Sequence, residues 1–95
     1  MSTVRPVARL PERLTLEQAV PVLAQLRAAL LQQGAGEAAL DAADLRECDS
    51  SAVAVLLELR RVLRQQGRDL RLHNSPQRLR DLVALYGVQG LLPAA

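Results

Sequence analysis

Aromatic residues are almost absent from this sequence, since Tyr86 is the only one among 95 residues. Phe, Trp, Ile and Lys do not occur, and all twelve basic residues are Arg, set against ten acidic residues. Proteins that bind nucleic acids usually combine clustered positive charge with stacking aromatic rings. A net charge of +2 and one aromatic ring therefore argue against a nucleic-acid partner, and the core is predicted to consist of Leu, Val and Ala.

Cysteine and histidine are equally scarce, with one residue of each, Cys48 and His73. A disulfide framework needs pairs of Cys, and a zinc site built by one chain would lack its usual ligands. We therefore expect neither a metal nor any other cofactor. No run of about 18 apolar residues occurs, and the N-terminus has no apolar signal core. These absences predict a cytoplasmic protein that does not insert into a membrane.

The length and the hydrophobic pattern predict a single α/β domain over residues 1–95. Short apolar segments at residues 4–10, 37–45 and 70–73 have the character of strands, and Pro6 places the first at a sheet edge. Helical segments alternate with them. The expected fold is a small mixed β-sheet with helices packed mainly on one face, in the order β-α-β-α-β-α. A chain this short buries a limited core, so a homo-oligomer is also an expectation.

The first helix is predicted to begin at Thr15, where Thr15-Leu16-Glu17-Gln18 fits a capping box, and to end at Gly34. Pro21 lies within this segment, and in a regular helix its ring clashes with the carbonyl four residues earlier. We therefore expect one short turn and then a main helix that begins near Pro21. The apolar face of this segment, at helical spacing, is Leu16, Val20, Leu23, Leu26 or Arg27, and Leu30.

The other two helices have clear start and stop signals. Asp49-Ser50-Ser51 opens the second helix and Gly67 closes it, while Ser75-Pro76 opens the third and Gly87 ends it. An apolar tail, residues 88–93, should pack back onto the core. The residues expected to face the core are Ala52, Val55, Leu56, Leu59, Leu63 and Gln66 in the second helix, and Leu79, Leu82, Val83 and Tyr86 in the third.

Candidate chemistry is concentrated between the strand end at Asp41 and the helix start at Asp49-Ser50-Ser51. The free backbone amides and the positive dipole end of a helix favour an added phosphate. Asp41 and Asp49 could hold a metal ion or orient a serine hydroxyl in phosphoryl transfer. Alternatively, Asp49 and the serines only cap the helix, and the pattern alone favours this interpretation because such caps are common. No Ser-His-Asp arrangement is evident, and we expect no enzymatic activity.

The segment from Leu40-Asp41 to Asp49-Ser50-Ser51 resembles the signature of STAS domains, the sulfate-transporter and anti-sigma-factor-antagonist family. In that family an apolar-Asp strand end precedes Asp-Ser-Ser-Gly at a helix start. The resemblance extends over about residues 10–93. It implies the STAS fold and a non-enzymatic protein that acts through a protein partner. The contact surface that it implies consists of Asp41, Arg46, Asp49, Ser50, Ser51, Ala52 and Val53.

Two branches of that family are compatible with the residues. Leu85-Tyr86-Gly87-Val88 and Leu91-Leu92-Pro93 are similar to the tail of MlaB-type proteins, the STAS subunits of the Mla phospholipid ABC transporter of Gram-negative bacteria. This similarity implies a partner that is the transporter's ATPase subunit. The other branch, the anti-sigma factor antagonists, binds an anti-sigma kinase and is phosphorylated at the position of Ser51, whereas the MlaB-type hydroxyl falls at Ser50. Serine at both positions leaves the choice open.

The chain departs from the family pattern in two places. Ala52 and Ala54 stand where many members have glycine, and the methyl group of Ala52 is expected to crowd the approach of a kinase to Ser51. The first strand of the family's sheet is expected to be missing or very short. Both departures concern the phosphorylation switch or the sheet edge, and neither alters the predicted fold class.

Acyl carrier proteins are a remote alternative, because they carry a phosphopantetheine arm on the serine of an Asp-Ser pair at a helix start. Asp49-Ser50 would fit that pattern. The recognition helix of those proteins is acidic, whereas the corresponding helix here contains Arg60, Arg61 and Arg64 and the single acid Glu58. The predicted strands also argue against their all-helical fold.

Overall fold

The central sheet has three strands in the order β1-β3-β5, formed by Ala8–Arg9, Ala38–Asp41 and Leu70–His73 in the computed structural model. The structure describes residues 8–32 and 36–92. Each pairing in this sheet is parallel, and each crossover between neighbouring strands contains a helix, as parallel pairs require. The mixed sheet that we expected is therefore parallel throughout the described residues. The predicted first strand is present as β1, and its residues 4–7 lie outside the described part of the chain.

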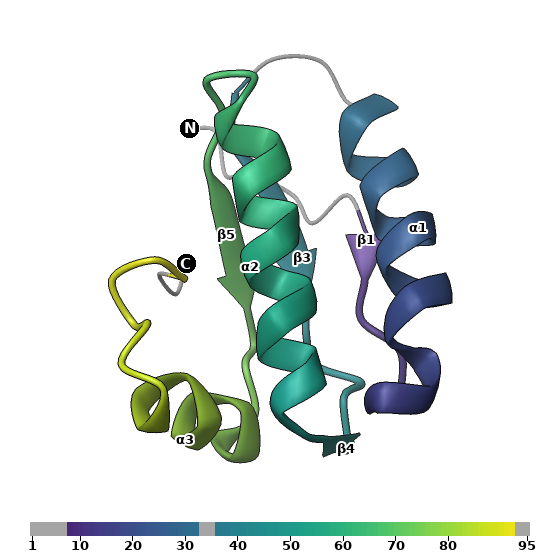
Figure 1. Cartoon of the computed structure of the whole chain (residues 1–95), viewed down its shortest axis with the longest axis vertical. Helices are drawn as coiled ribbons and strands as arrows, with labels where there is room; N and C mark the ends of the chain where they lie inside the picture. Colours follow the sequence, from purple (N-terminus) through teal and green to yellow (C-terminus); the bar gives the residue numbers. More distant parts are fainter. Residues whose placement is uncertain (1–7, 33–35, 93–95) are drawn as a thin grey trace.

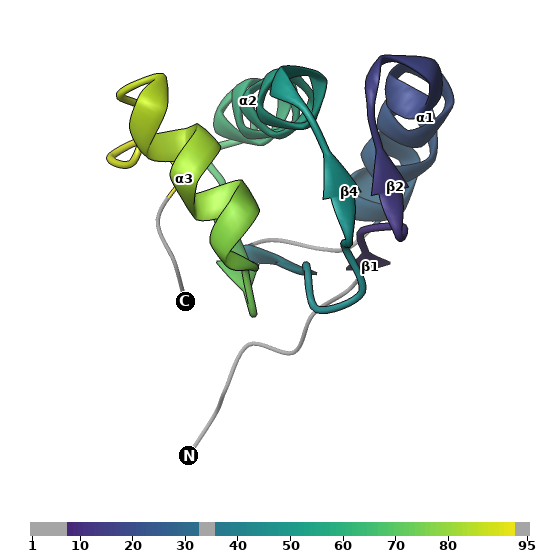
Figure 2. The same ribbon diagram turned by 90° about the horizontal axis from the view of Figure 1, so that it is seen from below.

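The described residues also form three helices: α1 (Leu16–Gln32), α2 (Ser50–Arg64) and α3 (Gln77–Leu85). Figure 1 shows α1 and α2 side by side in front of the sheet, with α3 below the end of β5. The view from below in Figure 2 places α1 and α2 on the same side of the sheet. The α/β class and the packing of helices mainly on one face are thus confirmed, with two extra short strands inserted in the expected order.

These extra strands, β2 (Arg13–Leu14) and β4 (Glu47–Cys48), form a separate parallel pair. The sequence pattern did not predict these two strands, because two residues are too few to show the alternation of a strand. The carbonyl of Glu12 accepts the N–H groups of Arg46 and Glu47, at 2.8 and 3.0 Å. Since β2 leads into α1 and β4 leads into α2, this pair sets the two helix starts beside each other.

The helix α1 runs without interruption past Pro21, contrary to our expectation of a break there. Its start follows the capping-box prediction in part, since the Gln18 side chain accepts the Thr15 N–H at 3.0 Å. Pro21 is exposed, so its ring meets solvent and the buried face made by Val22, Leu26 and Leu30 holds the helix against the core. The predicted end at Gly34 lies outside the described residues.

The core consists of Leu, Val and Ala, as predicted, with Cys48 also buried. Five of the six residues expected to face the core from α2 are buried, while Gln66 is exposed beyond the helix end. In α3 the three aliphatic residues are buried, but Tyr86 is 53% exposed. Tyr86 is the C-cap residue of α3, and Leu92 of the tail that follows is buried in the core.

Helix ends follow the glycine signals. Gly67 and Gly87 have φ values of +69° and +68°, the left-handed conformation that glycine adopts without steric cost. The start of α3 differs by one residue from the prediction, because Pro76 is the N-cap and no side chain caps the helix there. Proline fixes an extended entry into the helix, so the Ser75 hydroxyl is not needed for it.

One buried charge, Arg68, was not anticipated. Arg68 is only 4% exposed, and its guanidinium donates to the carbonyls of Leu30 and Gly36 at 2.8 and 2.9 Å. These carbonyls belong to the last turn of α1 and to the start of the segment before β3, so the side chain joins them to the end of α2. Within residues 8–32 and 36–92, no helix is long and apolar enough to cross a membrane.

Candidate functional site

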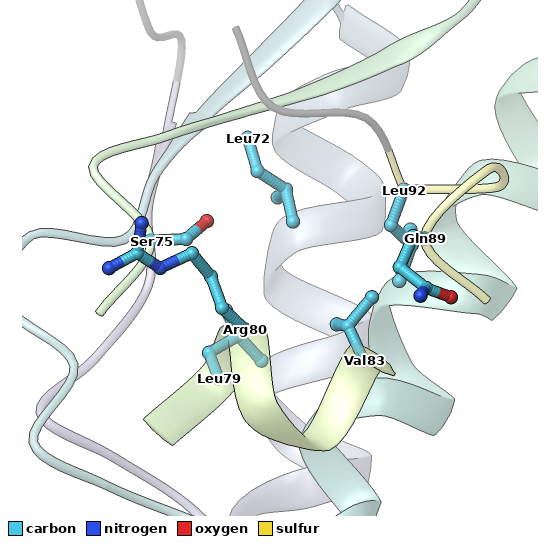
Figure 3. Close-up of a pocket in the computed structure, with 7 residues that line it drawn as sticks. All are labelled: Leu72, Ser75, Leu79, Arg80, Val83, Gln89 and Leu92. Atoms are coloured by element: carbon cyan, nitrogen blue, oxygen red, sulfur yellow. The ribbon is translucent and has the colours of Figure 1, made fainter. Parts of the chain in front are cut away.

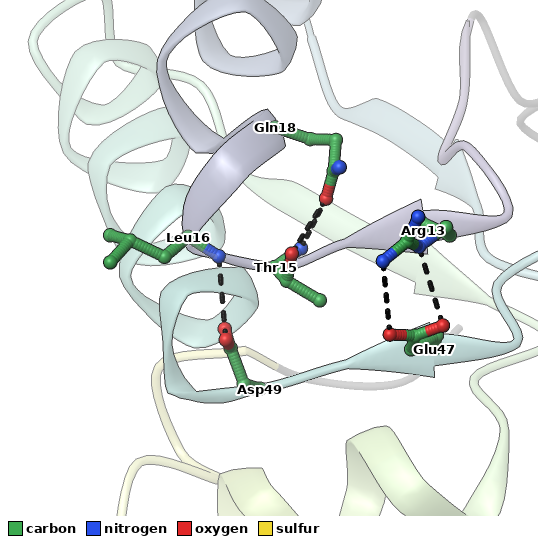
Figure 4. A network of polar contacts seen from close by, with 6 residues as sticks. All are labelled: Arg13, Thr15, Leu16, Gln18, Glu47 and Asp49. Carbon is green, nitrogen blue, oxygen red and sulfur yellow. Dashed lines mark hydrogen bonds and ion pairs between the residues drawn. The ribbon is translucent and has the colours of Figure 1, made fainter.

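The Asp49 carboxylate is hydrogen-bonded to the starts of two helices. One oxygen accepts the Ser51 N–H of α2 at 2.8 Å. The other accepts the Leu16 N–H of α1 at 3.3 Å, as Figure 4 shows. This arrangement depends on the β2–β4 pair, which is reinforced by an ion pair between Arg13 and Glu47 at 3.3 Å. The capping role that the sequence pattern favoured for Asp49 is therefore confirmed, and it extends to a second helix.

Both contacts also act on the ionisation of Asp49. The Ser51 N–H is the main reason that the pKa of this carboxyl lies below its ordinary value of 3.8, and the Leu16 N–H lowers it further. An ionised carboxylate at the positive ends of two helix dipoles interacts favourably with both. Asp49 is thus a fixed negative charge between α1 and α2 at neutral pH.

The two serines that follow Asp49 face different grooves. Ser51 is half-buried and lines an apolar groove of about 230 Å³ between α1 and α2, together with Leu16 and Val20. Ser50 is exposed and lines a groove of about 430 Å³ between α2 and the end of α3, beside Tyr86. The first turn of α2 is therefore a ridge with one hydroxyl on each side.

Large apolar side chains are exposed around this ridge. Leu16 and Val20 are 76% and 78% exposed on one side, and Tyr86 is 53% exposed on the other. We call the area the cap surface and define it as Leu16, Val20, Ser50, Ser51, Ala54, Leu57 and Tyr86. The sequence pattern placed Leu16 and Val20 on the apolar face of the first helix and Tyr86 on that of the third. The available signal was that α1 has more apolar positions than one buried face can hold.

Asp41 and Arg46, which were also expected at the site, make contacts elsewhere. Asp41 accepts the Ala43 N–H at 2.9 Å and the Asn74 amide at 3.1 Å, and these bonds, the first above all, lower its pKa. Asn74 lies in the short connection between β5 and α3 and has a φ of +58°. Its bond to Asp41 holds this connection against the end of β3. Arg46 pairs with Glu12 at 3.6 Å. Neither residue is hydrogen-bonded to Asp49.

Ala52 and Val53 were expected to touch a partner, but both side chains are buried, at 0% and 3% exposure. Ala52 belongs to the hydrophobic core. Contrary to our expectation, its methyl group therefore does not crowd the approach of a kinase to Ser51. Val53 contributes to the wall of the groove beside Ser50. Within the described residues, no group of three His, Cys, Asp or Glu side chains is placed to hold a metal ion.

Comparisons with known proteins bear on the family and the fold. The family model described as Mlab, STAS domain, matches residues 1–93. Among solved structures, the unphosphorylated anti-sigma factor antagonist SpoIIAA shares the fold with a TM-score of 0.72 and 21% sequence identity, covering 99% of this chain and 84% of that one. No curated protein matches the sequence. The chain belongs to the STAS domain family, in its MlaB-type branch.

Proposed function

We propose that this STAS protein is a cytoplasmic, non-enzymatic subunit that binds and regulates the ATPase of an Mla-type phospholipid ABC transporter. The cap surface is the proposed contact. The observation that carries the proposal is the exposure of Leu16, Val20 and Tyr86 around a helix start whose backbone is fixed by Asp49. The match to the MlaB-type family model supports the choice of partner.

The cap surface has the composition of a protein contact. Exposed apolar side chains that gather in one place, with polar groups at their edge, are typical of sites where another protein docks. Tyr86 offers a large ring with a hydroxyl, a residue type that often dominates the binding energy of interfaces. Because Asp49 holds α1 and α2 at this point, the surface needs little ordering when a partner binds, which favours affinity.

A second candidate, an anti-sigma factor antagonist controlled by phosphorylation, is favoured by one observation. Ser50 is exposed at the first turn of α2, where a phosphate would be stabilised by the helix dipole. Ser51 is less suited, because its side chain is half-buried and its N–H is already bonded to the ionised Asp49. If a kinase acts on this protein, we therefore infer that Ser50 is its target.

Size-exclusion chromatography of the purified protein with an Mla-type ATPase tests the main proposal. We expect co-elution with the ATPase and no ATP hydrolysis by this protein alone. Val20→Asp should abolish co-elution, because it places a charge in the apolar groove between α1 and α2. The matched control is Leu91→Asp, since Leu91 is also exposed, at 40%, but lies outside the cap surface.

The result can separate the two candidates. Co-elution with a sigma-regulating kinase and not with the ATPase would replace the transporter function by the second candidate. Co-elution of Val20→Asp with the ATPase at wild-type level would contradict the assignment of the contact to the cap surface. Circular dichroism of both variants shows whether the fold is retained.

A further inference from the structure

An apolar cavity separate from the cap surface lies between the end of β5, α3 and the segment that follows α3 (Figure 3). Its volume is about 240 Å³. Four aliphatic side chains line it, each at most 7% exposed, and three polar residues complete the lining. The aliphatic residues are Leu72, Leu79, Val83 and Leu92, and the polar residues are Ser75, Arg80 and Gln89. The proposed contact with an ATPase uses none of these residues.

Arg80 places a positive charge beside this cavity. Its side chain extends from α3 toward Ser75 (Figure 3). Its guanidinium donates to the Gln77 side-chain oxygen at 2.8 Å. The Gln77 amide is neutral, and among the residues that the structure describes no carboxylate is paired with Arg80. By contrast, Arg61 and Arg64 on α2 have ion-pair partners at 2.6 and 2.8 Å. A guanidinium without an ion-pair partner among the described residues, beside an aliphatic cavity, favours a ligand that has both a negative charge and an aliphatic chain.

We propose that this cavity binds a small amphipathic carboxylate, with its aliphatic chain among the four aliphatic side chains and its head group at Arg80. Filling an apolar cavity recovers dispersion contacts that its lining otherwise lacks. Guanidinium groups bind carboxylates through paired, charge-assisted hydrogen bonds. At about 30 Å³ for each water-sized group, the volume suits a chain on the order of eight carbons. Octanoate has this size and charge.

Isothermal titration calorimetry with three probes tests the proposal on the full chain. Octanoate should bind with a dissociation constant of about 1 mM or tighter, a range that its small size allows. Octanol has a similar chain without the charge and should bind about tenfold more weakly. Acetate has the charge without the chain and should give no binding signal.

Variants separate the two halves of the site. Arg80→Gln should weaken octanoate binding about tenfold and leave octanol binding unchanged, because only the head group loses its partner. Arg78→Gln is the matched control, since Arg78 is exposed on the same helix and does not line the cavity. Val83→Phe should abolish the binding of both long-chain probes by filling the space, and a thermal melt checks that this variant folds.

The absence of a binding signal for octanoate would overturn the proposal. Equal octanoate affinities of Arg80→Gln and Arg78→Gln would also overturn it, because the head group would then lie elsewhere. Since Arg80→Gln replaces a surface residue, this second outcome remains informative even if Val83→Phe does not fold. None of these variants changes the cap surface, so loss of octanoate binding and loss of ATPase binding are distinguishable.

Discussion

Asp49 is the residue whose removal should affect two helices at once, because its carboxylate accepts an N–H from α1 and one from α2. Asp49→Ala leaves both N–H groups without this partner. We expect its melting temperature to fall by about 4–8 °C, the shift that follows from the loss of a typical helix cap in a domain of this size. The melting temperature of Asp49→Asn should fall less. The Asn side chain keeps one oxygen that can accept an N–H, whereas its NH₂ group cannot accept one.

The contribution of Asp49 should also depend on pH. Its pKa is lowered in the folded protein from an ordinary value of 3.8, so the unfolded chain binds its proton first as pH falls. The stabilisation is therefore complete above pH 3.8 and is lost as pH drops through the folded value below it. Melting curves of wild type and Asp49→Asn should differ at neutral pH and converge in this acidic range. A constant difference down to pH 2 would contradict the ionised cap.

Ser50 and Ser51 allow a test that separates stability from binding. Ser50→Asp and Ser51→Asp each add a negative charge to the first turn of α2, which the helix dipole favours, so their melting temperatures should equal or slightly exceed that of wild type. A partner buried against the cap surface would remove water from the new charge, and both variants should then lose binding. Ser51→Asp should lose more, because Ser51 is half-buried in the groove between α1 and α2.

A melt and a pull-down with the ATPase on the same samples provide the measurement. The matched control is Ser75→Asp, which places the charge just before α3, at the cavity lined by Leu72 and Leu79 and outside the cap surface. If Ser50→Asp and Ser51→Asp both bind as well as wild type, the two serines only belong to the helix cap.

Among the elements, α1 is the one in which the structure and the sequence prediction differ most. A substitution of Pro21 can test whether the helix is continuous from Leu16 or begins near Pro21. If α1 is continuous from Leu16, as the structure shows, Pro21 lies in its interior and deprives it of one hydrogen bond. Pro21→Ala should then raise stability by about 1–3 kcal/mol. If the helix began near Pro21, proline would be favourable there and the substitution would be neutral or destabilising. Urea titration followed by circular dichroism measures the sign.

How well each element could be predicted depended on whether its signals were local. α2 and β5 followed directly from the Asp49 cap, the Gly67 stop and the alternation at Leu70–His73. The strands β2 and β4 were missed, because two residues have no periodicity and acquire a partner only through tertiary structure. The exposure of the apolar residues of the cap surface, Leu16, Val20 and Tyr86, was missed for a related reason. When a helix has apolar residues on more than one face, the sequence does not show which of them are buried.

The candidate site was therefore predictable only in part. Asp49, Ser50 and Ser51 were found because helix caps have a strong local pattern. Asp41 was placed at the end of a strand correctly, but its partner Asn74 lies 33 positions later in the chain, and no local pattern connects them. Ala52 and Val53 were included in the predicted site because they follow Ser50 and Ser51 in the sequence. The turn of the helix directs their side chains inward instead, and both are buried.

For the molecule as a whole, the small core implies a narrow margin of stability. A domain of 95 residues is expected to be stable by roughly 5–14 kcal/mol. Leu59 is 1% exposed in the centre of α2, so Leu59→Ala should cost about 2–5 kcal/mol by leaving a cavity. We expect a large fall in the melting temperature, or loss of the folded state. Leu85→Ala is the control, since Leu85 is 76% exposed and should change little. A Leu59→Ala melt that overlays the wild-type curve would contradict the packing of α2.

The parallel sheet has a consequence for how the chain reaches its fold. Ala8 pairs with Leu40 and Ala38 pairs with Leu70, so each strand meets a partner 32 positions away, and neither pair can form as a hairpin. Closing such loops costs entropy before any ladder bond is made, and domains with these distant contacts refold in milliseconds to seconds. During synthesis at about 5–20 residues per second, β3 has no neighbour on its β5 side until His73 has left the ribosome. Until then, the nascent chain exposes an open strand edge, which is the stage at which a chaperone would matter most.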